Sequence, residues 1–342
     1  MNRLQSTLGI DLPILAAPMA GGPSTPELVA ASAQAGGAGF LAGGYKTSEA
    51  LKDQIEAMRA QSIPFGVNLF APHPIPVADH RFRSYARAIK PEADHYGLQL
   101  AEEPLEDDDH WADKVDLLTS VPVPWVSFTF GIPDRTVIAA LRKAGTVVLQ
   151  SVTSVREACQ AVIAGVDGLI VQAHSAGGHS ATLTPEQPLK TPPLPVLANV
   201  IRQAVAVPII ATGGIAGPED VSAAVHAGAD AVMVGTALLR ADESGASEPH
   251  KAALADPAFT ETVMTQAFTG RPARALRNYF IEQYDPVAPE GYPALHNLTS
   301  PLRKAATAAG DTRLIHLWAG TGYREARSEP TSRVLERLAS QL

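Results

Sequence analysis

Eight short apolar runs, most of them rich in β-branched residues, recur along the chain with helix-like segments between them. Within each run the apolar residues follow one another without the alternation of a half-exposed strand. Strands of this kind are buried on both faces, as in a parallel sheet covered by helices. The runs are residues 13–19, 38–43, 65–70, 125–130, 146–150, 168–172, 208–212 and 231–235.

The segments between the runs carry helix start and stop signals. Residues 26–36 begin with a proline after Ser24 and Thr25 and end in a glycine, and residues 155–165 and 218–228 also end in glycine. Eight strands alternating with helices predict an α/β protein with a (β/α)8 TIM barrel. An open doubly wound sheet is the alternative, but its Gly-x-Gly-x-x-Gly fingerprint is missing after the first strand.

Two segments interrupt this alternation. Residues 71–120 are rich in proline and acidic residues, and we expect a partly helical insertion there within a barrel domain of residues 1–240. Residues 241–300 follow the eighth run and predict a mainly helical cap on the substrate side, and residues 301–342 are expected to return to the barrel. The cap is expected over the barrel mouth, where active sites of this fold lie.

Composition narrows the function classes. The 342 residues are 46% hydrophobic and 18% charged, which suits a large buried core. The net charge is −8, and we expect the short basic cluster Arg271–Arg277 to be solvated, so no nucleic-acid partner is predicted. The absence of a signal-like or membrane-length apolar stretch predicts a cytoplasmic monomer or homodimer with no membrane partner. The single Cys159 and the scattered histidines predict no metal site.

Glycine-rich loops follow the last two runs. Residues 212–218 read Thr-Gly-Gly-Ile-Ala-Gly-Pro, and Gly235 and Thr236 follow the eighth run. In barrels of this type, the loops after strands seven and eight commonly bind a phosphate through backbone N–H groups. Both loops together therefore predict a phosphate cradle, although glycine pairs are also frequent in ordinary turns.

Other strand ends add groups that suit a flavin. Residues 173–180, after the sixth run, read Ala-His-Ser-Ala-Gly-Gly-His-Ser, and His179 in this loop can accept or donate a proton near neutral pH. Asn68 and Gln172 stand late in two runs, and their amides can bond to the edge of a heteroaromatic ring. Taken singly, each amide is equally well explained as a buried group bonded to backbone.

Several blocks of sequence, in order, resemble the nitronate monooxygenases, formerly called 2-nitropropane dioxygenases. The blocks are residues 13–22, 25–28, 35–41, 65–70, 176–179, 211–215 and 234–237, and residues 292–303 and 317–322 resemble the bacterial class I branch. The likeness covers nearly the whole chain. Ser175, Ser180 and Thr321 depart from the family pattern, which often has Glu, Arg and Gln at these places.

The resemblance implies an FMN-dependent monooxygenase with a detoxifying role. Such enzymes oxidise alkyl nitronates, particularly propionate 3-nitronate, with O2 through one-electron transfer to the flavin. His179 would be the active-site histidine, acting as general base toward a neutral nitroalkane or orienting a nitronate anion. Trp318 and Gly320 would close over the flavin, and Tyr292, Arg303 and Lys304 would contact the anionic substrate. The residues implied around FMN are Ala17, Pro18, Met19, Asn68, Gln172, Gly177, Gly178, Gly213, Gly214, Met233, Gly235 and Thr236.

Three other functions remain open at this stage. The same FMN barrel could be an NAD(P)H-dependent reductase of the enoyl-acyl-carrier-protein or quinone type, although the sequence holds no separate dinucleotide domain. A barrel without redox chemistry could use the phosphate cradle for a phosphorylated metabolite. A non-catalytic flavin-binding scaffold is the remaining alternative.

Overall fold

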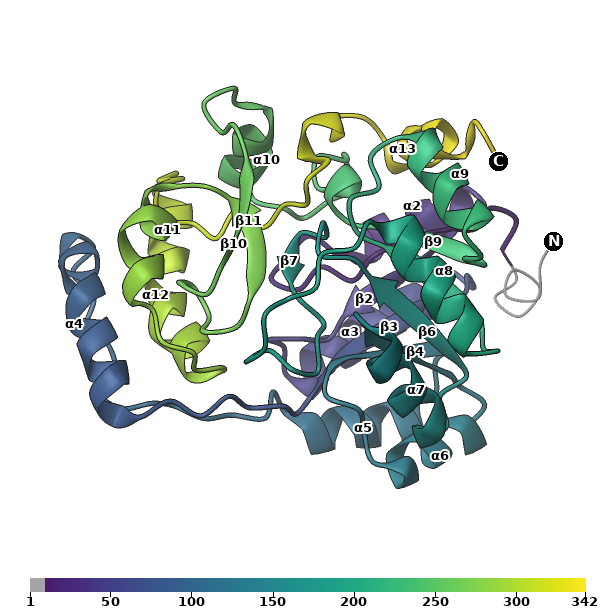
Figure 1. The fold of residues 1–342 in the computed structure, drawn as a ribbon, viewed down its shortest axis with the longest axis horizontal. Coiled ribbons are helices and arrows are strands. Elements are labelled where there is room, and N and C mark those ends of the chain that lie inside the picture. The colour runs from purple at the N-terminus through teal and green to yellow at the C-terminus, as the bar shows by residue number, and fades with distance from the viewer. Residues whose placement is uncertain (1–9) are drawn as a thin grey trace.

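A computed structural model describes residues 10–342 and contains a closed barrel of eight parallel strands (Figure 1). Each predicted apolar run forms one strand, so the predicted (β/α)8 barrel is confirmed. The strands, in their order around the barrel, are β1 (Ile14–Ala16), β2 (Ala38–Ala42), β3 (Gly66–Ala71), β4 (Trp125–Phe130), β5 (Val147–Val152), β6 (Gly168–Gln172), β8 (Ile209–Thr212) and β9 (Ala231–Val234).

A layer of helices surrounds the strands. The helices are α2 (Pro26–Gln34), α3 (Ser48–Arg59), α5 (Trp111–Ser120), α6 (Arg135–Lys143), α7 (Val155–Ala164), α8 (Leu194–Ala204), α9 (Pro218–His226) and α13 (Thr331–Ala339). Thr25 caps α2 by accepting a hydrogen bond from Leu28 N at 3.0 Å, and Gly165 ends α7 in a left-handed conformation. The C-terminal α13 contacts α2 and α9 and so closes the helix layer beside β1.

The barrel interior changes from apolar to polar toward the carboxyl ends of the strands. Large apolar side chains fill the lower part, and they are Leu15, Phe40, Trp125, Leu149, Ile170 and Ile210. Above them the Nδ2 of Asn68 donates to the Oγ of Ser127 at 2.9 Å and to the Oγ1 of Thr129 at 3.1 Å. The polar atoms of the barrel are therefore concentrated at the edge where a ligand binds in this fold.

A second hydrophobic cluster lies beside the barrel mouth, on the left in Figure 1. It is formed by α4 (Asp79–His95), α10 (Glu248–Ala255), α11 (Tyr279–Tyr284) and α12 (Ala294–Ala308), together with β10 (Thr262–Thr265) and β11 (Ala273–Leu276). We call these six elements the cap. Its buried aromatic side chains include Phe82, Tyr85 and Phe280.

The cap contains a small antiparallel sheet that the sequence analysis did not predict. Its strand order is β10-β11-β7, and β7 consists only of Gly178 and His179 from the loop after β6. His179 is paired with Ala273, and Gly178 with Arg274. The barrel loop that carries His179 is therefore hydrogen-bonded to the cap.

The segment limits drawn from the sequence stay predictions, and two helices qualify them. α5 lies within residues 71–120 but packs on β3, α3 and α6, in the helix layer of the barrel. α12 runs continuously from Ala294 to Ala308, across the division placed between residues 300 and 301. Pro301 lies inside α12 and does not end this helix.

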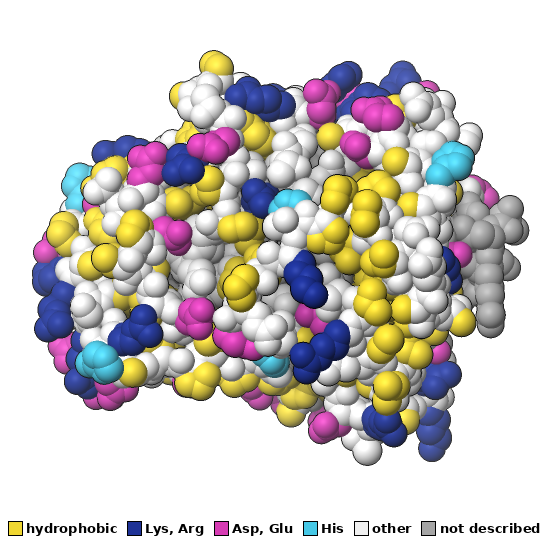
Figure 2. Space-filling model, viewed as in Figure 1, with side chains coloured by type: hydrophobic (Ala, Val, Ile, Leu, Met, Phe, Trp, Pro, Cys, Tyr) yellow, Lys and Arg dark blue, Asp and Glu magenta, His cyan; other side chains and the backbone are white. Residues whose placement is uncertain are grey.

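Charged side chains of both signs are scattered over the face shown in Figure 2. Hydrophobic side chains gather over and beside α8 in the same view, and the exposed apolar residues of this region are Ile163, Val196 and Val200. Among the helices of residues 10–342, none has the length and apolar character needed to cross a bilayer.

Candidate active site

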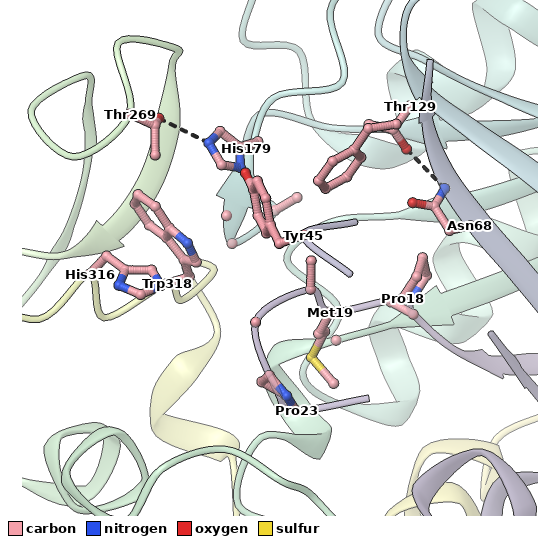
Figure 3. Close-up of a pocket in the computed structure, with 18 of the residues that line it drawn as sticks. Pro18, Met19, Pro23, Tyr45, Asn68, Thr129, His179, Thr269, His316 and Trp318 are labelled. Atoms are coloured by element: carbon pink, nitrogen blue, oxygen red, sulfur yellow. Dashed lines mark hydrogen bonds between the residues drawn. The ribbon is translucent and has the colours of Figure 1, made fainter. Parts of the chain in front are cut away.

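A cavity of about 1050 Å³ opens between the carboxyl ends of the barrel strands and the cap. The predicted residues His179, Arg303 and Lys304 line it. Figure 3 shows His179 in this cavity. All twelve residues expected around the cofactor line it as well, namely Ala17, Pro18, Met19, Asn68, Gln172, Gly177, Gly178, Gly213, Gly214, Met233, Gly235 and Thr236. Tyr292 instead lines an adjoining cavity of about 350 Å³.

The two glycine loops form a cradle, and the loop after β8 has no room for side chains at Gly213 and Gly214. Gly213 and Gly214 have φ of +111° and +77°, and a Cβ on Gly214 would lie 2.7 Å from the Oγ of Ser175. The backbone N–H groups of Gly214 and Gly235 donate to no residue in the described part of the chain. The Oγ1 of Thr236 accepts a hydrogen bond from Gly320 N at 2.9 Å, which leaves the hydroxyl proton available. These donors suit an anion.

The C-terminal segment closes one side of this cradle. The N of Thr321 donates to the carbonyl oxygen of Ser175 at 3.0 Å. A Cβ on Gly177 would lie 2.5 Å from the N of Gly320, so the two loops touch through backbone alone.

The turn after β1 forms the floor of the cavity. The Oγ of Ser24 accepts a hydrogen bond from Met19 N at 2.8 Å and donates to the carbonyl oxygen of Ala17 at 3.2 Å. Figure 3 shows Pro18 and Met19 on this floor, opposite Trp318 and His316. The space between this floor and the rings of Trp318 and His316 suits a flat ligand.

The two predicted amides have different roles. The side-chain hydrogen bonds of Asn68 to described residues all use its Nδ2, and Figure 3 shows the one to Thr129. The amide of Gln172, in contrast, is held by backbone, because Nε2 donates to the carbonyl oxygen of His179 and Oε1 accepts from Ala181 N. Gln172 therefore shapes the loop that carries His179.

His179 is enclosed by aromatic rings. Its ring centroid lies 5.4 Å from that of Trp318, 5.5 Å from that of Phe130 and 5.9 Å from that of Tyr292. Burial, followed by the positive charges of Arg271 and Arg303, lowers the pKa of His179 to about 3. The ring is therefore neutral at physiological pH.

Two arginines bring positive charge to the site without a carboxylate within ion-pair distance in residues 10–342. Arg303 is 5% exposed, and its guanidinium bonds to Thr299, His296 and His316. Arg271 is fully buried, and its guanidinium carbon lies 4.1 Å from the centre of the Phe130 ring. Burial lowers the pKa of each to about 10, so both remain charged near neutral pH. A bound anion would compensate this charge.

The predicted solvation of the basic cluster 271–277 is wrong for two of its members. Arg271 is 0% exposed and Arg274 is 8% exposed, whereas Arg277 lies at the surface and pairs with Glu261. The reason is that Arg274 lies in β11, the central strand of the cap sheet, and Arg271 lies just before this strand and donates to the carbonyl oxygen of Thr182. Arg274 bonds to the carbonyl oxygens of His174 and Thr262 there.

Several site residues were missed by the sequence analysis. Tyr45 and Phe130 line the cavity with left-handed backbones, at φ of 62° and 80°, which is costly for bulky residues. His296 stacks on Tyr45 at 4.0 Å, and Thr269 bonds to His179. Tyr45, in turn, bonds through its hydroxyl to that of Tyr292 at 3.2 Å. No local pattern marks these residues, because they come from loops and helices far apart in the chain.

Comparisons with known proteins agree with this geometry. The family model described as nitronate monooxygenase matches residues 2–340. The chain belongs to the nitronate monooxygenase family. It is 35% identical to a probable nitronate monooxygenase from Staphylococcus aureus strain Newman, over 100% of this chain and 97% of that one. The family assignment makes the chain an oxidoreductase enzyme.

Two solved structures resemble this chain over its whole length. The nitroalkane oxidase from Streptomyces ansochromogenes matches with a TM-score of 0.94 and 45% identity, covering 100% of this chain and 98% of that one. FabK from Thermotoga maritima matches with a TM-score of 0.78 and 27% identity, covering 100% of this chain and 96% of that one. The family and the nitroalkane oxidase neighbour support oxidoreductase activity on nitro compounds.

Proposed function

We propose that this chain is an FMN-dependent enzyme that oxidises alkyl nitronates, propionate 3-nitronate among them, with O2. The observation that carries the proposal is a single cavity with a glycine cradle on the barrel side and the uncompensated charge of Arg303 on the cap side. An enzyme that holds a phosphorylated cofactor and a small anionic substrate needs both features.

The residues of the barrel side fit FMN. The N–H groups of Gly214 and Gly235 and the hydroxyl of Thr236 can donate to its phosphate, beside Gly213. The residues that would contact the flat ring system are Ala17, Pro18, Met19, Asn68, Gln172, Gly177, Gly178 and Met233. When bound, FMN supplies an electron acceptor for the substrate and a route for those electrons to O2.

The residues of the cap side fit the substrate. Arg303 supplies positive charge to hold a nitronate, and Lys304, which is exposed at the cavity rim, attracts the anion from solvent. The phenol of Tyr292 stays neutral because burial raises its pKa well above 10. Tyr292 bonds to Tyr45 and packs against the ring of His179, the proposed catalytic residue, and so fixes the position of that ring.

The chemistry at His179 depends on the charge of the substrate. A neutral nitroalkane can lose its α-proton to the unprotonated ring, which acts as a general base. A nitronate has already lost that proton, and Arg303 then supplies the positive charge that holds the anion beside the ring. Trp318 packs on His179 and reduces the access of water to the reacting atoms.

An anaerobic absorbance titration of the FMN-loaded protein tests the proposal. Propionate 3-nitronate is added to one sample and NADH to another. Loss of the oxidised flavin band with the nitronate and not with NADH supports nitronate oxidation. A protein that neither binds FMN nor changes colour with the nitronate contradicts it.

The same titration decides the alternative function. An NAD(P)H-dependent reductase of the enoyl-acyl-carrier-protein or quinone type on this barrel draws support from the structural likeness to FabK. Reduction of the flavin by NADH alone would favour the reductase. Reduction by both compounds would require a comparison of kcat/KM for the two, because the better electron donor is the one that the site fits.

A further inference from the structure

Thr269 joins His179 to the backbone of the cap. It lies in the turn between β10 and β11, lines the cavity and is 1% exposed. Its Oγ1 lies 2.9 Å from the Nε2 of His179 and 3.2 Å from the carbonyl oxygen of Arg271. Figure 3 shows the first of these contacts.

The groups bonded to the Thr269 hydroxyl, a ring nitrogen and a carbonyl oxygen, determine which atoms carry the protons. A hydroxyl has one proton to donate, and a carbonyl oxygen can only accept. The Thr269 hydroxyl therefore donates to Arg271 O and accepts from a protonated Nε2 of His179. The opposite arrangement would leave the carbonyl without this donor and would place the only ring proton at Nδ1, where no acceptor exists among residues 10–342.

The other nitrogen of the ring has no protein partner. No residue in the described part of the chain bonds to Nδ1 of His179, and Nδ1 is not among the polar atoms sealed from solvent without a partner. Figure 3 shows it on the side of the ring away from Thr269. A neutral imidazole has one N–H, so a proton on Nε2 leaves a lone pair on Nδ1.

We infer that Thr269 is a positioning residue that fixes His179 as the Nε2–H tautomer and presents an unprotonated Nδ1 to the cavity. The inference rests on the proposed function and deepens it by assigning the nitrogen atom, Nδ1, that would accept the proton of a neutral nitroalkane. In that step the α C–H bond breaks and its electron pair forms the C=N bond of the nitronate. The proton moves to Nδ1, and the negative charge resides on the nitro oxygens beside Arg303.

The tautomer can be measured without turnover. The FMN-loaded protein is labelled with ¹⁵N-histidine, and the signals of His179 are assigned by their loss in His179→Asn. The wild-type protein is expected to show a protonated Nε2 and an unprotonated Nδ1. The reverse tautomer in the wild-type protein would overturn the inference.

Two variants test whether the hydroxyl is the cause. Thr269→Val removes the hydroxyl and keeps the shape of the side chain, and we expect its His179 to show both tautomers. Thr269→Ser keeps the hydroxyl and is expected to show the wild-type form. An unchanged tautomer in Thr269→Val would overturn the role of Thr269.

Activity on paired substrates tests the consequence. With nitroethane, which must lose a proton, we expect Thr269→Val to lower kcat/KM about tenfold, a part of the whole general-base effect. With the preformed nitronate of nitroethane the change is expected to be less than about twofold, since no proton is removed. An equal loss on both substrates would mean that Thr269 supports the fold and would overturn the inference. If the wild-type protein oxidises neither substrate, the proposed function fails, while the ¹⁵N measurement still decides the tautomer.

Discussion

The barrel and the cap contribute opposite kinds of chemistry to one cavity. The barrel residues expected around the cofactor offer neutral groups, which are glycine N–H groups, the amide of Asn68 and the hydroxyl of Thr236. The cap side brings the titratable and charged groups, which are His179 through the β7–β11 pairing, His296, His316, Arg303 and, behind Phe130, Arg271. In the function that we propose, the barrel recognises the cofactor, whereas the cap selects the substrate and handles its proton.

The largest effect is expected from removing the group that reacts. His179→Asn is expected to lower kcat for a neutral nitroalkane about 100-fold or more, the range of a lost general base. Its affinity for FMN is expected to remain within about threefold of wild type, because the cofactor groups belong to the barrel. Stopped-flow flavin reduction and FMN titration measure the two quantities. A large loss of FMN affinity would break the division between barrel and cap.

Removing the buried positive charge is expected to have the next largest effect. Arg303→Gln should raise KM for propionate 3-nitronate about 30-fold, since a hydrogen bond to a charged group contributes roughly 1.5–3 kcal/mol. The matched control is Lys304→Gln, because Lys304 is the next residue in the chain but is exposed to solvent. The control is expected to change KM less than about threefold. Equal effects would show that net charge at the mouth matters and the position of Arg303 does not.

A change in the cradle tests the barrel side. In Gly214→Ala, the new Cβ would be strained by the left-handed backbone and by contact with the side chain of Ser175. Because left-handed strain costs roughly 1–2 kcal/mol, the affinity for FMN is expected to fall about tenfold. Gly145→Ala carries similar strain, at φ of +93°, but its Cβ meets no atom within 4 Å. Fluorescence titration of the apoproteins with FMN is expected to show no change for this control.

Lowering the pH is expected to reduce the hydrogen-exchange protection of the cap before that of the barrel. This effect is expected to be smaller than the preceding ones. Four buried histidines lie in the cap or in segments packed against it. Burial lowers the pKa of His179 to about 3 and that of His250 to about 4. It lowers the pKa of His296 and His316 well below 6.5. The unfolded chain therefore binds more protons below about pH 6.5, and the free energy of unfolding falls as the pH drops.

Hydrogen exchange at pH 7.5 and 5.5, corrected for intrinsic rates, measures this difference. Amides of α11 and α12 are expected to lose protection at the lower pH relative to those of β8 and β9. The aromatic and charged groups that face His179 from the neighbouring elements are Phe130, Tyr292, Trp318, Arg271 and Arg303, and none of them gains a proton in this interval. Equal loss in both regions would argue against a separate response of the cap.

Much of the barrel could be predicted because its signals are local. Each strand is a continuous apolar run, and the cradle glycines follow two consecutive strands. The cap sheet could not be predicted, since β7 has two residues and its pairing partners Ala273 and Arg274 lie far along the chain. The burial of Arg271 was missed for the same reason, because its environment is created by distant segments. The clustering of aromatic residues around His179 likewise has no trace in the spacing of the sequence.

The pairing of β7 with β11 limits how this protein can be recombined. The height of the His179 ring above the cavity floor depends on hydrogen bonds to a strand that lies outside the barrel. A cap taken from a relative would therefore need its own loop 173–183 to keep the imidazole in register. In a chimera that exchanges residues 248–308 alone, His179 would pair with a β11 strand taken from another protein. The smallest exchangeable unit includes that loop, even though the chain enters it from the barrel.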